Sequence, residues 1–104
     1  NIVVKRNELT AEIDLLVIND GMAIAVECKS NCSTSDIEDH LKRLEKLKEL
    51  LPEYQSLQLM GAIAAIIMPD SVARCAYKRG LYILAQSADT VLVLNDDKFT
   101  PRTW

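Results

Sequence analysis

The sequence lacks several features that would assign it to a class of protein at once. Its longest apolar run, residues 59–68, is well below the roughly 20 residues that span a bilayer, so no membrane segment is expected. It has no glycine-rich phosphate loop, internal repeat or low-complexity tract. The net charge of −3 argues against a strongly basic protein that binds nucleic acid indiscriminately. A more selective interaction with a polyanion is compatible with this charge, because some acids could belong to a metal site.

Cysteine and histidine are too few for a structural zinc site. Cys28 and Cys32 have no second Cys/His pair to complete tetrahedral ligation, and His40 is the single histidine. With Cys75, the cysteines form an odd number in a chain without secretory features, which favours a reducing, cytoplasmic location. Cys28 is expected to be a small buried residue on the core face of a strand.

The 104 residues are enough for one domain with a single core. Apolar residues make up 49% and charged residues 26%, which is ordinary for a globular domain. The alternation of apolar and polar residues predicts an α/β domain whose elements follow the order βββαβαββ. The expected strands are residues 2–4, 12–18, 22–29, 59–68, 81–84 and 91–94, with helices at 35–51 and 69–79.

The two strands within residues 12–29 carry charges at positions where a strand is usually apolar. Successive side chains of a strand point to opposite faces, so Glu12 and Asp14 share one face of the first strand. Glu27 and Lys29 share one face of the second strand in the same way. The first strand is also expected to pair with the β-branched run at residues 2–4.

The turn between these strands determines their register. An Asp-Gly pair at residues 20–21 tolerates positive φ angles and favours a two-residue hairpin loop. That loop places Asp14 opposite Glu27, and Glu12 opposite Lys29.

Opposed carboxylates on a sheet have Cβ atoms roughly 5 Å apart and repel each other. A divalent cation would relieve this repulsion, and Mg²⁺ characteristically takes one or two carboxylates plus water or phosphate oxygens. The alternative is a simple salt bridge of Lys29 with an acid on a solvated face. The metal site is favoured because the neighbouring residues on this face are apolar and predict that it is covered. They are Leu16, Ile18, Ala23 and Ala25.

The helix at residues 35–51 is expected to begin with a capping box formed by Ser35 and Glu38. On its outer face Glu38 is spaced to pair with Lys42, and Asp39 with Arg43. Its buried stripe is expected to comprise Ile37, Leu41, Leu44, Leu47 or Lys48, and Leu51.

Asp14, followed after a hairpin by Glu27-Cys28-Lys29, resembles the D…(D/E)-x-K signature of the PD-(D/E)xK, or restriction-endonuclease-like, nuclease superfamily. The order of elements agrees: two strands that carry the acids, a polar loop, an amphipathic helix and an apolar strand. The run V-E-C-K-S followed by S-D-I-E-D-H-L-K-R-L is similar to an uncharacterised branch of that superfamily, and the resemblance covers almost the whole chain.

The resemblance implies a restriction-endonuclease-like fold with a mixed central sheet flanked by helices. In the superfamily a helix usually precedes the first strand and often supplies a further acid. This sequence opens directly on a strand at Asn1, so the first helix of the family core is missing. Residues 1–104 are therefore expected to be a single nuclease-like domain from a longer chain.

The activity implied by the resemblance is that of an endonuclease dependent on Mg²⁺ or Mn²⁺, hydrolysing nucleic acid and most naturally DNA. Asp14, Glu27 and the backbone carbonyl of Cys28 would bind the metal, and Lys29 would orient or activate the attacking water. Glu12 would be a further ligand or support the site. The alternative is a catalytically inactive module for nucleic-acid binding or oligomerisation, in which the acids only satisfy Lys29.

Two further expectations concern the rest of the surface. Related nucleases can carry auxiliary polar residues on the helix after the motif, which makes Asp36 and His40 secondary candidates, although His40 is more readily explained as a helix-edge residue. The missing helix would leave apolar surface bare around Ile2, Val4 and Leu15. A second apolar edge is expected at residues 81–82 and 91–94, so a symmetric homodimer is predicted.

Overall fold

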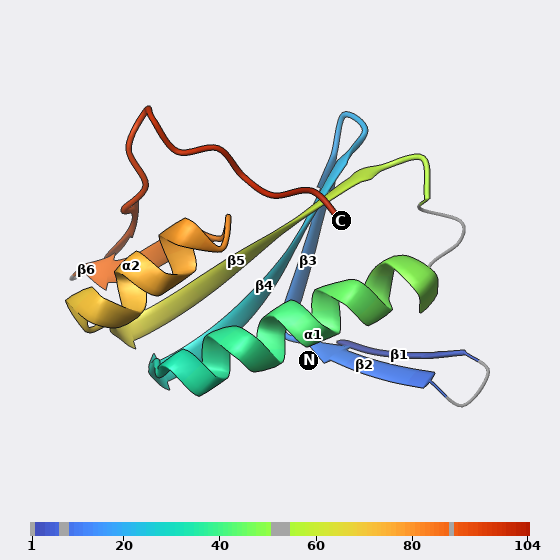
Figure 1. Ribbon diagram of the computed structural model, residues 1–104, viewed down its shortest axis with the longest axis horizontal. Helices are drawn as coiled ribbons and strands as arrows, with labels where there is room; N and C mark the ends of the chain where they lie inside the picture. The colour runs from blue at the N-terminus through green and yellow to red at the C-terminus, as the bar shows by residue number, and fades with distance from the viewer. Residues whose placement is uncertain (1, 7–8, 51–54, 88) are drawn as a thin grey trace.

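The computed structural model describes residues 2–6, 9–50, 55–87 and 89–104, and within these the side chains of 14–50, 55–86 and 89–104. The elements are β1 (Ile2–Arg6), β2 (Leu9–Ile13), β3 (Leu15–Asn19), β4 (Met22–Asn31), α1 (Thr34–Leu50), β5 (Gln58–Ile67), α2 (Asp70–Lys78), β6 (Tyr82–Ser87) and β7 (Thr90–Val93). Figure 1 shows α1 and α2 lying along a sheet of long strands, with the β1–β2 hairpin at one end of α1.

The main sheet has five strands in the order β3-β4-β5-β6-β7. Its central strands β4, β5 and β6 are parallel, while β3 and β7 are antiparallel edge strands. The parallel pairs are joined by α1 and α2, as a βαβ connection requires. The expected α/β class with a mixed sheet is therefore confirmed.

The predicted hairpin turn is confirmed. Asn19 pairs with Met22, and the two residues between them adopt positive φ, 48° at Asp20 and 79° at Gly21. This two-residue loop fixes the β3–β4 register.

The expected strand 12–18 is wrong in one respect, because it is broken at Asp14. The residues before the break form β2, which pairs with β1, and those after it form β3, which pairs with β4. At the break the Asp14 carboxylate accepts a hydrogen bond from the backbone N–H of Cys28, at 2.8 Å. A side chain thus satisfies a β4 donor beyond the last β3 pair, Leu15 with Val26, and the order of elements becomes ββββαβαββ.

The start of α1 also differs from the prediction. The capping box is formed by Ser33 and Asp36 rather than by Ser35 and Glu38: the Ser33 N–H donates to Asp36 Oδ2 at 2.9 Å, and the Asp36 N–H donates to Ser33 Oγ at 3.3 Å. Both pairs have the required spacing, and the earlier one starts the helix directly after β4. Glu38 pairs with Arg79 of α2 instead of with a residue of its own helix.

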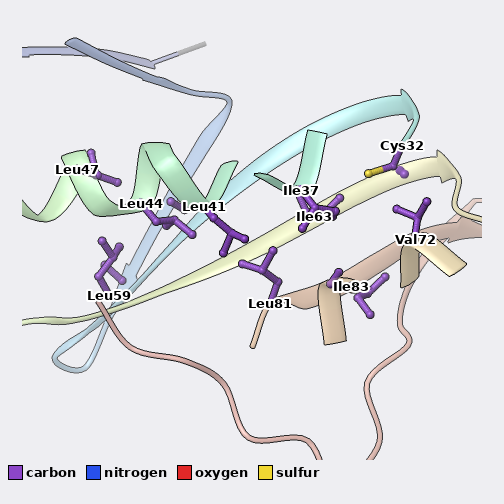
Figure 2. Close-up of a cluster of buried hydrophobic side chains, with 14 residues drawn as sticks. Cys32, Ile37, Leu41, Leu44, Leu47, Leu59, Ile63, Val72, Leu81 and Ile83 are labelled. Atoms are coloured by element: carbon purple, nitrogen blue, oxygen red, sulfur yellow. The ribbon is translucent and has the colours of Figure 1, made fainter. Parts of the chain in front are cut away.

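The core lies between α1, α2 and one face of the sheet. Figure 2 shows side chains of α1, β5 and β6 gathered there. The helix comes very close to the sheet at Gly61, where an added Cβ would lie 2.5 Å from Leu44 Cδ1 and 2.7 Å from Leu81 Cδ2. The buried residues of α1 are Ile37, His40, Leu41, Leu44, Leu47 and Leu50. Leu47 rather than Lys48 therefore belongs to the stripe, and the expected Leu51 lies outside the described residues.

The segment after β7 returns along the molecule toward α1 (Figure 1). The backbone N–H of Trp104 donates to the carbonyl of Leu59 at 2.8 Å, so the tail occupies the edge of β5 before β6 begins. Arg102 stacks on the Trp104 ring at 4.6 Å and pairs with Glu45 of α1 at 2.7 Å. The tail thereby ties the sheet to α1.

The opposite face of the sheet is called here the bare face, because α1 and α2 both pack on the other side. The exposed residues that point to it are Leu15, Val17, Met22, Ile66, Val91 and Val93, each between 42% and 64% exposed. Leu81, expected at an apolar edge, is instead fully buried, and the side chains of Ile2 and Val4 lie outside the described residues. None of the helices in the described part of the chain is long and apolar enough to cross a membrane.

Candidate functional site

The candidate site lies where the bend before β3 meets the middle of β4 and of α1. Glu27 and Lys29 stand on the face of β4 that α1 covers, and their neighbours Ala23 and Ala25 on that face are buried. The expectation of a covered face is confirmed for this strand. It fails at Ile18 of β3, which is 46% exposed at the far end of the hairpin.

The structure brings the Asp14 and Glu27 carboxyl groups together. The Asp14 carboxylate accepts the N–H of Cys28, the residue after Glu27, at 2.8 Å, and its negative charge is near enough to raise the pKa of Glu27. Burial raises the pKa of Glu27 above its ordinary value, the Arg43 guanidinium opposes this shift, and the Asp14 charge adds to it. The Glu27 residue is only 7% exposed, so this carboxylate is largely removed from bulk water.

Two cations face opposite oxygens of Glu27. Lys29 Nζ lies 3.7 Å from Glu27 Oε1, and Arg43 Nη1 lies 3.4 Å from Glu27 Oε2. Lys29 Nζ is also 3.6 Å from Asp36 Oδ1 at the start of α1. The four side chains form a row of alternating charge, Arg43–Glu27–Lys29–Asp36, that joins β4 to α1.

Arg43 is the site residue that sequence reasoning missed. It was assigned to the outer face as a partner of Asp39, and this was wrong, because Arg43 reaches inward to Glu27. The signal was in the spacing: Asp36, His40 and Arg43 follow each other at intervals of four and three residues, which places them on one side of a helix. That side faces the acidic strand.

Asp36 caps the start of α1 and also forms an ion pair with Lys29. Its carboxylate accepts the Ser33 N–H at 2.9 Å, and this hydrogen bond holds the pKa of Asp36 below its usual value. Because the same residue caps α1 and contacts Lys29, the position of the ammonium group is tied to the start of the helix.

His40 belongs to the core. The expectation of a helix-edge position was wrong, since the residue is completely buried and its Nε2 lies 3.0 Å from the carbonyl oxygen of Ala25. Burial lowers the pKa of His40 to about 4, so the ring is neutral at neutral pH. Its other nitrogen, Nδ1, has no hydrogen-bond partner among the described residues. A direct part in chemistry would require access that this position does not give.

Two other predicted positions differ from the expectation. Glu12 lies on β2 opposite Val3 and does not pair with Lys29, because the chain bends at Asp14 before it joins β4; its side chain lies outside the described residues. Cys28, expected to be buried, is exposed, because it points to the bare face while Glu27 and Lys29 point to the covered one. All three cysteines are free.

Two grooves lie outside the Asp14–Glu27 pair, and Lys29 is the site residue that lines one of them. One, of about 330 Å³, is formed at the ends of β4, β5 and β6 by Cys28, Lys29, Ser30, Ala64, Ala65, Ile66, Leu84, Gln86 and Val91. Most of these side chains point to the bare face, so this groove lies across the sheet from Glu27. The other, of about 340 Å³, follows α2 and is lined by Ser71, Arg74, Cys75, Lys78 and Arg79. Its lining is basic.

Comparison with known proteins gives no match: no family model, curated protein or solved structure matches the chain. Among the described residues, no group of three or more His, Cys, Asp or Glu side chains is placed to hold a metal ion together. A site for Mg²⁺ does not need three, because this ion is commonly held by one or two carboxylates and completes its shell with water and substrate oxygens.

Proposed function

We propose that this domain is a metal-dependent nuclease of the PD-(D/E)xK type, which hydrolyses phosphodiester bonds of nucleic acid, with DNA as the expected substrate. The observation that carries the proposal is that Asp14 is hydrogen-bonded to the Cys28 N–H at 2.8 Å, next to the buried Glu27, whose Oε1 lies 3.7 Å from Lys29 Nζ. Repelling carboxylates in a partly buried position cost stability, and such arrangements are typical of functional sites. The restriction-endonuclease-like fold belongs to the same proposal, which the mixed sheet and the order of elements support.

The residues present fit a hard divalent cation. Asp14 and Glu27 supply carboxylate oxygens, and the backbone carbonyl of Cys28, between Glu27 and Lys29, supplies a further oxygen of the kind that Mg²⁺ or Mn²⁺ prefers. When bound, the metal would neutralise the two acids, lower the pKa of a water ligand and polarise the phosphate. The cysteine thiol at position 28 takes no part, because it points to the other face.

The position of Lys29 supports the proposal. Its ammonium is held between Glu27 and Asp36, 3.7 Å and 3.6 Å away, so it stays at the acidic site rather than moving freely in solvent. From there it can orient a water molecule and stabilise negative charge that develops on a phosphate. Glu12 remains a proposed supporting acid at the adjoining end of β2.

The basic groove of α2 supports a polyanionic substrate. The chain as a whole has a net charge of −3, yet Arg74, Lys78 and Arg79 line one groove. The ion pair of Arg79 with Glu38 places α2 beside the first turns of α1, near the end of the row of charges. A phosphate backbone lying along this groove would be attracted electrostatically without base recognition.

A second candidate function is the catalytically inactive module, and one observation favours it. Both oxygens of Glu27 already face a cation, Lys29 on one side and Arg43 on the other. In this alternative the charges hold β4 to α1, and the fold serves nucleic-acid binding or oligomerisation.

The test is cleavage of labelled single-stranded DNA, duplex DNA and RNA by the purified chain in Mg²⁺, in Mn²⁺ and with chelator. The nuclease proposal expects metal-dependent products that disappear in Asp14→Asn and Glu27→Gln. Asp39→Asn, an exposed position on α1, is the matched control for the first change and should cleave like the unmodified chain. Binding of nucleic acid without cleavage in either metal would favour the inactive module, and cleavage that survives Glu27→Gln would refute the assigned site.

A further inference from the structure

Arg43 is held at the candidate site by charge rather than by a hydrogen bond. Its Nη1 lies 3.4 Å from Glu27 Oε2, and this nitrogen is buried without a hydrogen-bond partner among the described residues. The Arg43 side chain is 29% exposed, so it lies against the carboxylate with part of its length in solvent. An arginine whose nearest nitrogen lies 3.4 Å from the carboxylate without a hydrogen bond is not an ideal structural clamp, since strong arginine–carboxylate pairs are usually short and bidentate.

Arg43 and Lys29 are not equivalent partners of Glu27. Lys29 has a second acid, Asp36, at 3.6 Å, so its position does not depend on Glu27 alone. Among the residues whose side chains are described, the acid that pairs with Arg43 is Glu27. The guanidinium therefore lies against an oxygen of the carboxylate that the proposed metal would also use. It reaches this oxygen from α1, whereas Lys29 reaches Glu27 from β4 itself.

We propose that Arg43 is a built-in counter-cation that competes with the divalent metal for Glu27 and thereby sets the metal affinity of the site. The inference rests on the proposed function, because it takes Asp14 and Glu27 as metal ligands. In the metal-free protein Arg43 compensates the partly buried Glu27 charge. If a divalent cation binds the same carboxylate, the metal ion and the Arg43 guanidinium would lie within a few ångströms of each other, and their repulsion would weaken metal binding.

The direction of the effect separates this role from a positioning role. If Arg43 only held Glu27 in the correct orientation, removal of the guanidinium would weaken metal binding. If Arg43 competes, removal of its charge strengthens binding, and Arg43→Lys, which keeps the charge, leaves the affinity near that of the unmodified chain. The two roles therefore predict opposite signs for one measurement.

The experiment measures Mn²⁺ affinity by isothermal titration calorimetry, or by the electron paramagnetic resonance signal of free Mn²⁺, without any substrate. Arg43→Gln is expected to bind Mn²⁺ about tenfold more tightly than the unmodified chain, a size set by the Coulomb interaction at a partly solvated site. The matched control is Arg102→Gln, which makes the same chemical change in an exposed ion pair with Glu45 and should leave the affinity unchanged. Arg43→Met, which keeps an apolar stem, replaces Arg43→Gln if thermal unfolding shows that the latter is not folded.

Mn²⁺ binding that is equal to or weaker than that of the unmodified chain, measured on the uncharged variant that is folded (Arg43→Gln or Arg43→Met), would overturn the proposal. Titrations of Asp14→Asn and Glu27→Gln separate this failure from failure of the proposed function. If these acid variants lose Mn²⁺ binding while the Arg43 variants show no gain, only the role of Arg43 is wrong. If the unmodified chain and the Arg43 variants all fail to bind Mn²⁺, the metal site and the counter-cation role fall together. Binding that appears only after Arg43 is neutralised would support competition directly.

Discussion

The two faces of the five-stranded sheet make a useful comparison, because the same strands supply both. On the covered face, α1 and α2 enclose a core of leucine, isoleucine, valine and alanine, and the charged residues Glu27 and Lys29 lie at its border. On the bare face, apolar residues such as Leu15, Val17 and Val91 remain about half exposed or more.

The comparison shows that the helix-covered face buries a charged side chain while apolar side chains near the ends and edges of the bare face stay exposed. The middle of the bare face is buried without a helix over it, at Val26, Met60 and Ala62. Consecutive residues of β4 illustrate the contrast between the faces: Glu27, a carboxylate, is 7% exposed, while its apolar neighbour Cys28 points to the bare face and is exposed. Burial of a carboxylate is unfavourable unless cations compensate it, and Lys29 and Arg43 provide that compensation here. A carboxylate kept in such a position is available for a function that a solvated acid would perform less well.

The largest expected effect compares one substitution on the two faces. Leu44→Ala removes a fully buried side chain of α1 and should lower the free energy of unfolding by about 3 kcal/mol. Leu15→Ala makes the same change at a residue of β3 that is 50% exposed, and should cost less than about 1 kcal/mol in a monomer. Urea denaturation of both variants provides the measurement. Equal losses would mean that the bare face is buried in solution.

The next effect concerns pH and the buried histidine. The pKa of His40 is lowered from 6.5 to about 4, so the unfolded chain takes up this proton before the folded one does. The His40 contribution is therefore complete above about pH 6.5 and is lost as the pH falls toward 4, on the order of 3 kcal/mol in total. The free energy of unfolding from urea titrations between these pH values measures it.

Glu27 acts in the opposite direction in the same experiment. Its pKa is raised, so its unfavourable charge is relieved as the pH falls through that raised value. His40→Gln should flatten the acid-side loss of stability, and Glu27→Gln should make that loss steeper. An unchanged pH profile in His40→Gln would show that the ring is not held neutral in the folded protein.

The bare face can also be tested through association. Its exposed apolar side chains and the edge strand β7 favour the predicted symmetric homodimer. Val91→Lys places a charge on this face and should raise the dimer dissociation constant about tenfold or more, which corresponds to about 1.4 kcal/mol. Ser56→Lys adds the same charge at an exposed position between α1 and β5, outside the strands of the sheet. Analytical ultracentrifugation at micromolar concentration reads out both, and a monomeric unmodified chain would rule the dimer out.

The smallest expected effect is on the acids of the covered face. Asp14→Asn keeps an oxygen that can accept the Cys28 N–H, and removes one of two repelling charges. Glu27→Gln removes a desolvated charge but leaves Arg43 and Lys29 less well compensated. Both variants should stay within about 1 kcal/mol of the metal-free parent, with any change toward higher stability larger in Asp14→Asn. Thermal melts in chelator measure this, and unfolding of either variant would favour a structural role for the acids.

The sequence by itself determined the local features of the fold. The Asp20-Gly21 pair specified a two-residue turn and with it the β3–β4 register, because few residues tolerate the positive φ that this turn needs. Apolar spacing specified the stripe of α1, and the alternation of elements specified a mixed sheet with parallel crossovers. The last pair of that register is Leu15 with Val26, and Asp14 and Glu27 are the next residues along each strand, so their proximity was also foreseeable.

Only the tertiary structure decided that helices pack on one face of the sheet and leave the other without a helix. The sequence predicted cover over the face of Ala23 and Ala25, which is confirmed for β4, but it also placed Cys28 on a core face and His40 at a helix edge, and both of these expectations were wrong. The bend at Asp14 depends on a hydrogen bond across 14 positions of the chain, and the partner of Arg43 lies on β4. Contacts of this kind are set by packing between elements, whereas periodicity reports only the neighbours that each residue has within its own element.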